Sequence, residues 1–276
     1  MPSLNLSVIQ MDLSAGYDHN LRKAEQLVRT AKDQGSQLAV LPELFAWNWF
    51  PVEENSQLFQ LAEDDQGPTL CQVQRWAAEC RISLAAPLYE RSGEHRFNTT
   101  YIISDTGTVL GKYRKNHIPY HPGWYERYYY QPGDLGFPVF HLAGLRIGVQ
   151  TCWDNLLPEG SRVLGLLGTD VILAPRGTGR YTVGRWRTAL LANALANGCY
   201  VATANRIGLE GDRYEFGGDS FIGDPQGEIA GSATEQDEVV TRTIDREAVV
   251  RARSEWPFFY DLRPEIYHAA GDTVGR

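Results

Sequence analysis

Short apolar segments alternate with amphipathic ones along this chain, and this alternation constrains the fold more than any other feature. Residues 38–41 (LAVL) and 171–174 (VILA) are fully apolar and too short for buried helices, so they predict buried strands. Residues 18–34 instead carry apolar side chains at helical spacing, and Gly35 stands where a helix would end. Buried strands and one-faced helices together indicate a sheet covered by helices.

The same patterns extend along the chain and predict one layered domain. Strands are expected at residues 4–10, 38–41, 82–89, 98–104, 108–113, 139–142, 145–150, 171–174, 199–204, 220–223 and 239–244. Helices are expected at residues 18–34, from about 69 to 80, from 158 onward, at 185–197 and, capped by Asp245, to about 253. Hairpin-like pairs favour a mixed sheet, and the tail from Trp256 is expected to be irregular.

Charge and composition exclude several classes of function. The 276 residues include 26 Lys and Arg against 34 Asp and Glu, a net charge of −8, without a basic block, which disfavours a nucleic-acid partner. No segment reaches the roughly 18 consecutive apolar residues of a membrane span. The start, MPSLNLSVIQMD, lacks the basic and apolar regions of a signal peptide.

The cysteines point to a reducing environment. Cys71, Cys80, Cys152 and Cys199 form no C-x-x-C pair, and a chain of this size needs no disulfide framework. We therefore expect a cytoplasmic protein with four separate thiols. Three of them lie within apolar patterns, where a small hydrophobic residue is the ordinary interpretation, whereas Cys152 is flanked by Thr, Trp and Asp.

Cys152 also ends an expected strand, at the turn before a helix. Such a turn exposes a nucleophile and offers a backbone N–H beside it. A nucleophilic thiol further needs a base, and the negative charge that forms on the substrate needs a donor. The base and the donor must therefore come from other segments of the chain.

Two other segments place a charged residue at the end of a strand. Glu43 follows the apolar strand 38–41 by two residues, where a carboxylate suits a general base; a solvent-exposed loop glutamate is the alternative. Strand alternation places Lys112 and Arg114 on one face and Lys115 on the other, so Lys115 can point inward while its neighbours face water. A solvated edge strand is the alternative there.

Metal and phosphate sites find little support. The six histidines are scattered. His117 and His121 have the spacing of zinc ligands, but Pro119 and Pro122 break the helix that would align them. A glycine-rich phosphate loop with its lysine does not occur in the sequence, so we expect no metal and no cofactor.

The segments around Glu43, Lys115 and Cys152 together resemble the nitrilase, or carbon–nitrogen hydrolase, superfamily. The matching motifs are LPE (41–43), YRKNHIP (113–119), GVQTCWD (148–154), PE (158–159), ANRIG (204–208) and GDS (218–220). The resemblance implies an α+β fold, a four-layer α-β-β-α sandwich. It further implies a single domain over residues 1–276, with a core at about 4–254 and a C-terminal tail at about 255–276.

The resemblance also implies roles for particular residues. Glu43 matches the general base, Lys115 the catalytic lysine and Cys152 the nucleophile, while Glu126 matches a second glutamate that helps to hold the lysine and the substrate. The thiolate would attack an amide, ureido or nitrile carbon, pass through a thioester and release ammonia. The expected oxyanion and substrate pocket is formed by Trp153, Asp154, Tyr120, Arg176 and Asn205.

Within the superfamily, the CWD and NRIG segments look most like N-carbamoylputrescine amidohydrolases. That branch usually continues HIP with Asp-Gly, whereas this chain has Tyr120-His121, and the stretch after Pro175 is shorter, as in small-amide hydrolases. We expect hydrolysis of a small N-carbamoyl amine or amide. A small aliphatic or ω-amide amidase and a nitrilase are the alternatives within this class.

Some features keep two interpretations. Arg176, Arg180 and Arg185 either bind an acidic substrate or form a solvated basic loop, and the aromatic residues at 124–130 either line a pocket or pack together. The resemblance implies a homo-oligomer, and the helix from Pro158, with leucines at 164, 166 and 167, would supply its face or pack on the sheet. A non-catalytic binding or scaffold protein is disfavoured because the three catalytic positions are all occupied.

Overall fold

The structure is a computed structural model and describes residues 1–212 and 214–271. Its strands are β1 (Ser3–Asp12), β2 (Leu38–Val40), β3 (Ser83–Ser92), β4 (His95–Ile103), β5 (Val109–Arg114), β6 (Phe140–Leu142), β7 (Leu145–Val149), β8 (Val171–Leu173), β9 (Tyr200–Thr203), β10 (Arg206–Glu210), β11 (Tyr214–Gly217), β12 (Phe221–Gly223), β13 (Ile229–Ser232) and β14 (Glu238–Asp245). The helices are α1 (Tyr17–Asp33), α2 (Pro68–Cys80), α3 (Glu126–Tyr129), α4 (Pro158–Leu166), α5 (Val183–Asn197), α6 (Arg246–Glu255) and α7 (Pro264–Gly271). Short 3-10 helices are η1 (Phe50–Val52), η2 (Ser56–Leu61), η3 (Cys152–Leu156), η4 (Arg180–Thr182) and η5 (Phe258–Asp261).

The strands form two mixed sheets. The eight-stranded sheet has the order β11-β10-β1-β2-β3-β4-β5, and β14 also pairs with β1. β1 is parallel to β2 and antiparallel to β14, while its last residues pair with β10. The six-stranded sheet has the order β13-β12-β9-β8-β7-β6, with β7, β8 and β9 parallel. The mixed pairing that the hairpin patterns predict is confirmed.

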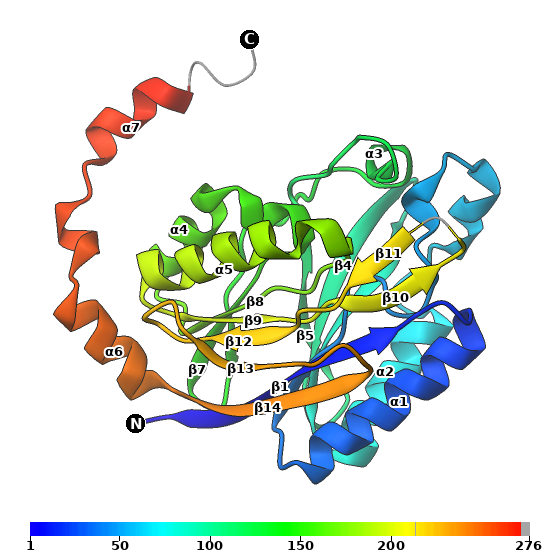
Figure 1. The fold of residues 1–276 in the computed structure, drawn as a ribbon, viewed down its shortest axis with the longest axis horizontal. Coiled ribbons are helices and arrows are strands. Elements are labelled where there is room, and N and C mark those ends of the chain that lie inside the picture. The colour runs from blue at the N-terminus through cyan, green and yellow to red at the C-terminus, as the bar shows by residue number, and fades with distance from the viewer. Residues whose placement is uncertain (213, 272–276) are drawn as a thin grey trace.

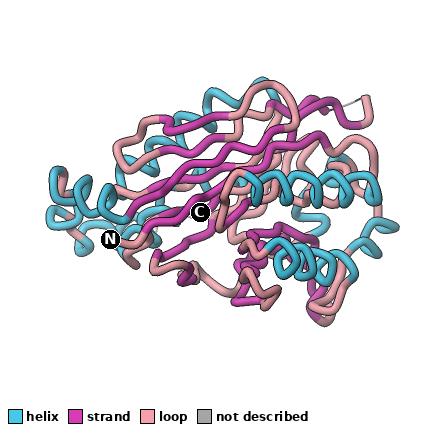
Figure 2. Tube along the Cα trace, turned by 90° about the horizontal axis from the view of Figure 1, so that it is seen from below, coloured by secondary structure: helices cyan, strands magenta, loops and turns pink. Residues whose placement is uncertain are grey.

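Three apolar cores separate four layers. The first contains residues from both sheets, such as Val8, Val40, Ile147 and Val171, so the sheets pack face to face. The second lies between the larger sheet and helices α1 and α2, and the third between the smaller sheet and helices α4 and α5. Figures 1 and 2 show the strands side by side with helices outside them. The predicted α-β-β-α sandwich is therefore confirmed.

Local sequence explains where helix α1 ends and where helix α6 begins. In α1, the side chains of Ala24, Val28 and Ala31 are buried on one face, which matches the predicted helical spacing. Gly35 follows with a φ of +79°, in the left-handed region that glycine adopts without strain. Asp245 caps α6 by accepting a hydrogen bond from the N–H of Glu247, as predicted.

Several regions differ from the sequence-based expectations, among them α3 and β13, which were not predicted. The β10–β11 hairpin was not predicted because residues 206–217 are rich in charge and glycine and lack an apolar alternation. The tail after Trp256 is not irregular, since it contains η5 and α7. Pro264 begins α7, because the first helical turn needs no N–H from that position. Figure 1 shows this tail running along one side of the sandwich.

The described part of the chain offers neither a membrane helix nor a metal cluster. Each of its helices falls short of the length or the apolar character that a bilayer crossing requires. Among the same residues, His, Cys, Asp and Glu side chains do not gather in groups of three or more that would suit a metal ion.

Candidate active site

Residues that follow three different strands meet in one buried cluster. Glu43 follows β2, Lys115 follows β5 and Cys152 follows β7. The Lys115 ammonium donates to Glu43 Oε1 at 2.8 Å and to Glu126 Oε2, from α3, at 2.6 Å. All three of these side chains are 0 % exposed, and Cys152 is 1 % exposed. The structure thus brings together the three residues predicted as catalytic and the supporting glutamate.

Each carboxylate in the cluster leaves one oxygen available. Glu43 Oε1 accepts a second hydrogen bond from the Asn98 side chain at 2.7 Å. Glu43 Oε2 and Glu126 Oε1 are buried and have no hydrogen-bond partner among residues 1–212 and 214–271. Buried carboxylate oxygens normally find partners, so this arrangement suits atoms that exchange a proton or contact a substrate. Asn98 was not predicted, because no local pattern distinguishes it from other residues of β4.

Burial and mutual charge control protonation in this cluster. Burial and the nearby Glu43 carboxylate raise the pKa of the Cys152 thiol well above its usual value. Although burial alone opposes its charge, Glu126 and Glu43 hold the pKa of Lys115 well above the usual lysine value. Burial also raises the pKa of Glu126, against the opposing effect of Lys115. The thiol therefore needs an adjacent base to become a nucleophile.

The backbone at Cys152 forms the turn predicted after the strand, but the thiol is buried rather than exposed. Its φ is +48°, in the left-handed region that non-glycine residues adopt at a cost of about 1–2 kcal/mol. The turn is held because the Cys152 N–H donates to the Pro175 carbonyl at 2.8 Å and the Asn155 side chain donates to the Cys152 carbonyl at 3.0 Å. The nearby backbone N–H of Gly177 acts to lower the pKa of the thiol, against the larger effect of burial.

Asp154 supports this turn with both carboxylate oxygens. One oxygen accepts from the Tyr113 hydroxyl at 2.7 Å and the Thr151 N–H at 3.0 Å. The other lies 2.9 Å from the His117 N–H, which donates to it, and 2.8 Å from His117 Nδ1. The hydrogen bond to Asp154 raises the pKa of His117. The Asp154 side chain is thus saturated by protein contacts, unlike a group that awaits a substrate.

Two other predicted pocket residues are also buried in protein contacts. The Arg176 guanidinium is 0 % exposed and donates to Thr203 Oγ1, Thr178 Oγ1 and the Asp219 carbonyl. Asn205 accepts from the Thr178 N–H at 3.0 Å and donates to the carbonyls of Thr178 and Gly218, which lie in two different loops. The alternative of a solvated basic loop is wrong for Arg176, and the predicted binding of an acidic substrate finds these guanidinium donors already taken up by protein groups.

Tyr120 and Trp153 lie nearer the surface. Tyr120 is half exposed, and its hydroxyl donates to Glu54 at 2.6 Å. The Trp153 ring packs against His121 and Trp186, with centroids 5.7 and 6.5 Å apart. Of the arginines predicted with Arg176, Arg180 pairs with Glu215 at 2.6 Å and Arg185 is exposed.

The neighbours of Lys115 do not face water as predicted. Arg114 is 7 % exposed and forms two hydrogen bonds with the carboxylate of Glu90, while Lys112 donates to Glu90 and Asp65. Strand alternation placed these side chains on the correct face, but that face is covered by loops. An ion-paired layer therefore takes the place of the expected solvated edge.

We call the aromatic side chains near the cluster the aromatic cover; among them is Tyr214, whose pKa is raised by burial and by the nearby Cys152. Trp124 packs edge-on against Tyr214 with 4.3 Å between centroids, and His121 lies 4.9 Å from Trp124. Beside these rings is a cavity of about 260 Å³ that is also lined by Tyr181 and Glu215. Further along the aromatic run, Tyr129 and Tyr130 instead pack against Phe50 and Tyr89, so the run divides between the cover and ordinary packing.

A buried thiol beside a carboxylate and an ammonium, at the strand ends of a four-layer sandwich, defines a class of cysteine-dependent hydrolases. The profile of the carbon-nitrogen hydrolase family matches residues 5–254. The chain belongs to this family, whose members are amidohydrolases that act on carbon–nitrogen bonds other than peptide bonds.

Individual relatives match nearly the whole chain. An N-carbamoylputrescine amidase of Arabidopsis thaliana is 33 % identical, covering 95 % of this chain and 93 % of its own. A citrullinase of Francisella tularensis is 31 % identical over 97 % and 98 %, and a nitrilase of Pyrococcus abyssi is 35 % identical over 91 % and 93 %. A carbon-nitrogen hydrolase structure from Helicobacter pylori G27 superimposes with a TM-score of 0.92, 28 % identity and 96 % and 97 % coverage.

Proposed function

We propose that the enzyme hydrolyses the ureido group of a small N-carbamoyl amine, or a small amide, with release of ammonia. The observation that carries this proposal is the cluster in which Lys115 holds Glu43 while Glu43 Oε2 stays without a partner among the described residues. In this arrangement a base can take the proton of the Cys152 thiol, and an ammonium lies ready for the negative charge that develops next.

The reaction then follows in two halves. Glu43 accepts the thiol proton, and the Cys152 sulfur attacks the carbonyl carbon. The C–N bond breaks as Glu43 returns the proton to the leaving nitrogen, so ammonia departs and a thioester remains. Glu43 next takes a proton from water, whose oxygen attacks the thioester carbon and frees the thiol. For a ureido substrate the product is a carbamate, which loses carbon dioxide to give the amine.

Lys115 and the backbone N–H of Trp153 would stabilise the tetrahedral oxyanion, each contributing about 3–4 kcal/mol. Glu126 holds Lys115 through one oxygen and would contact the substrate with its remaining oxygen. We assign Asp154, Arg176 and Asn205 to the support of the loops that carry these groups, because their polar atoms are occupied by protein contacts.

The preference for an N-carbamoyl amine rests on the relatives and on Tyr120. The relatives named as N-carbamoylputrescine amidase and citrullinase act on ureido compounds, which supports the same group here. Tyr120 stands where the amidase branch has a carboxylate, but its hydroxyl binds Glu54, which restores an acidic group at this position. A cationic amine tail would be favoured there.

A substrate panel with matched cysteine variants tests the proposal. Ammonia release is measured on N-carbamoylputrescine, N-carbamoyl amino acids including citrulline, glutaramate-like amides and simple nitriles. We expect the highest kcat/KM for a ureido compound and its complete loss in C152A, while the control variant C80A, altered at a buried packing thiol, keeps turnover. Undiminished hydrolysis by C152A would overturn the mechanism, and a preference for nitriles would favour the nitrilase alternative.

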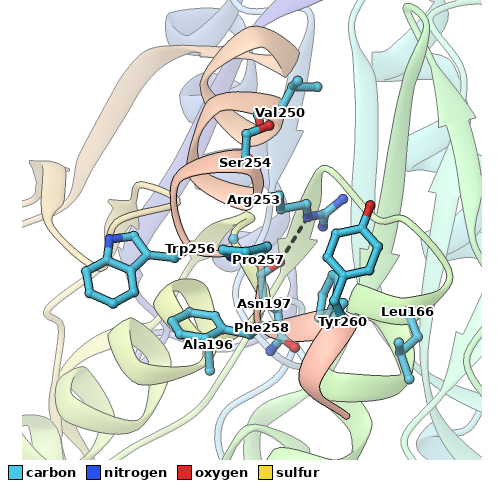
Figure 3. A pocket seen from close by; sticks show the side chains of 12 residues that line it. Leu166, Ala196, Asn197, Val250, Arg253, Ser254, Trp256, Pro257, Phe258 and Tyr260 are labelled. Atoms are coloured by element: carbon cyan, nitrogen blue, oxygen red, sulfur yellow. Dashed lines mark hydrogen bonds between the residues drawn. The ribbon is translucent and has the colours of Figure 1, made fainter.

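We further propose that the protein is a homo-oligomer in the cytoplasm. A groove of about 720 Å³ lies between the C-terminal tail and the helices of the smaller sheet, away from the catalytic cluster (Figure 3). Its rim carries exposed apolar side chains, Leu166, Trp256 and Tyr260, and a second copy of this chain is the occupant we propose. The four free thiols support a reducing compartment. Sedimentation of the wild type and of W256S/Y260S tests the assembly, and an unchanged mass would contradict it.

A further inference from the structure

A buried arginine outside the catalytic cluster is tied to the loop that carries Glu43. Arg206, the first residue of β10, is 0 % exposed, and its guanidinium binds the Glu210 carboxylate through two hydrogen bonds of 2.9 and 2.7 Å. The same guanidinium donates to the Glu43 carbonyl at 3.1 Å and to the Trp47 carbonyl at 2.8 Å. The Arg206 side chain therefore holds the main chain of Glu43 directly, through the Glu43 carbonyl.

Glu210, the ion-pair partner of Arg206, holds the loop that follows Glu43 at a third residue. Glu210 Oε2 accepts a hydrogen bond of 2.6 Å from the N–H of Trp49. The rings of Trp49 and Phe216 lie 5.4 and 5.0 Å from the guanidinium carbon, which excludes water from the ion pair. The Arg206–Glu210 pair thus fixes residues 43, 47 and 49 of one short loop.

That loop needs an external restraint. Leu44, directly after the base, has a φ of +53°, in a region that costs a non-glycine residue about 1–3 kcal/mol. The Glu43 side chain itself is held only at Oε1, by Lys115 and Asn98, within the described part of the chain. The position of Oε2 therefore depends on where the backbone of Glu43 is held.

We propose that Arg206, fastened by Glu210, is a positioning residue that holds the main chain of Glu43 so that its free oxygen faces the thiol. Arg206 contacts Glu43 through the backbone carbonyl and acts on the reaction only through this contact. The inference rests on the proposed function in one respect, namely that Glu43 acts as the base.

The structure provides a matched control. Arg114 is also buried and also forms two hydrogen bonds with a buried glutamate, Glu90, but neither of these residues contacts the loop of Glu43 in the described structure. Lysine retains the charge at either site but cannot reproduce the planar fork of donors. R206K and R114K should therefore lose comparable stability while differing in their effect on the reaction.

Three measurements on the full-length enzyme test the proposal: kcat and KM on the preferred ureido substrate, the pH dependence of Cys152 alkylation by iodoacetamide, and Tm. Because a displacement of about 1 Å at a reacting group can cost up to about 100-fold, we expect R206K to lower kcat by about 10- to 100-fold. KM should change less than about threefold, and alkylation of Cys152 should slow in parallel. R114K should keep kcat and alkylation. E210Q, which preserves shape, should fall between R206K and the wild type.

The outcomes separate the two proposals. If R206K and R114K lower Tm alike and leave kcat and alkylation alike, Arg206 is only a structural ion pair and the inference is wrong. If E43Q itself keeps wild-type turnover, the proposed function fails and this inference with it. If E43Q loses turnover while a folded R206K and a folded E210Q both keep it, only the inference about Arg206 fails.

Discussion

The chain contains two buried ionic clusters that begin at neighbouring residues, and they are built in opposite ways. Around Glu90, both carboxylate oxygens are saturated: one by Lys112 and Arg114, the other by Arg114 and Thr99. Around Lys115, Glu43 and Glu126 each keep one oxygen without a partner among the described residues. The same residue types thus form a fully hydrogen-bonded cluster around Glu90, beside β5. Around Lys115, at the end of β5, they form a cluster that lacks some hydrogen-bond partners.

Protonation follows this difference. Although burial alone raises the pKa of Glu90, hydrogen bonds from Arg114, Lys112 and Thr99 bring it below its usual value. Burial raises the pKa of Glu126, and a single ammonium shared with Glu43 does not reverse the shift. Buried charge alone therefore does not mark an active site. In this chain the candidate site is distinguished by two adjacent buried carboxylates that share one ammonium and each keep an oxygen without a partner among the described residues.

The largest effect that would sharpen the comparison is expected at Glu43. E43Q removes the proposed proton acceptor, and we expect kcat to fall by about 10²- to 10⁴-fold. Its Tm should stay equal to the wild-type value or rise, because the incomplete cluster stabilises the fold little. Steady-state ammonia release and thermal unfolding check this. A large loss of Tm would mean that the cluster is as structural as its neighbour.

The converse effect is expected at Glu90. E90Q leaves the buried Arg114 with the exposed Asp134 as its remaining carboxylate partner, and breaking a buried pair typically costs about 3–5 kcal/mol of unfolding free energy. We expect a clear fall in the urea midpoint with kcat per folded enzyme within about threefold of the wild type. If E90Q folds normally and loses turnover, the two clusters are functionally coupled and the distinction fails.

The pH dependence of stability should have opposite signs at the two glutamates. The pKa of Glu90 is lowered by folding, so its contribution is present above the pKa of the unfolded chain and is lost as pH falls through the folded value. The pKa of Glu126 is raised, so its contribution is present at low pH and is lost as pH rises through the folded value. Relative to the wild type, E126Q should therefore gain stability toward high pH, and E90Q should lose most there. Urea unfolding at pH 5, 7 and 9 compares them.

The smallest effect is expected at His117, on the rim of the Cys152 turn. Its pKa is raised by Asp154, so the stability it contributes is present below the unfolded histidine value of about 6.5 and is lost as pH rises through the folded value. H117N should lower Tm by a few degrees at pH 5.5 and by less at pH 8.5. An equal difference at both pH values would rule out a charged His117–Asp154 pair.

The comparison also indicates what the sequence could predict. The strand-end positions of Glu43, Lys115 and Cys152 follow from local patterns, because a short apolar run fixes where each strand stops. Glu126 has no such signal in its aromatic loop and was identified through family resemblance alone. Asn98, Arg206 and Glu210 were missed because their contacts join segments up to about 160 residues apart, as for Arg206 and Glu43. Arg114 was wrongly predicted to face water. Strand alternation predicts which face of the sheet a side chain lies on, but not whether other parts of the chain cover that face.

The aromatic cover over Cys152 has a consequence for the cell that contains the enzyme. A thiol that is only 1 % exposed beside packed aromatic rings is closed to a segment of folded polypeptide and suits a compact solute. The burial of Cys152, the proposed nucleophile, therefore keeps it away from the amide bonds of the folded proteins around it.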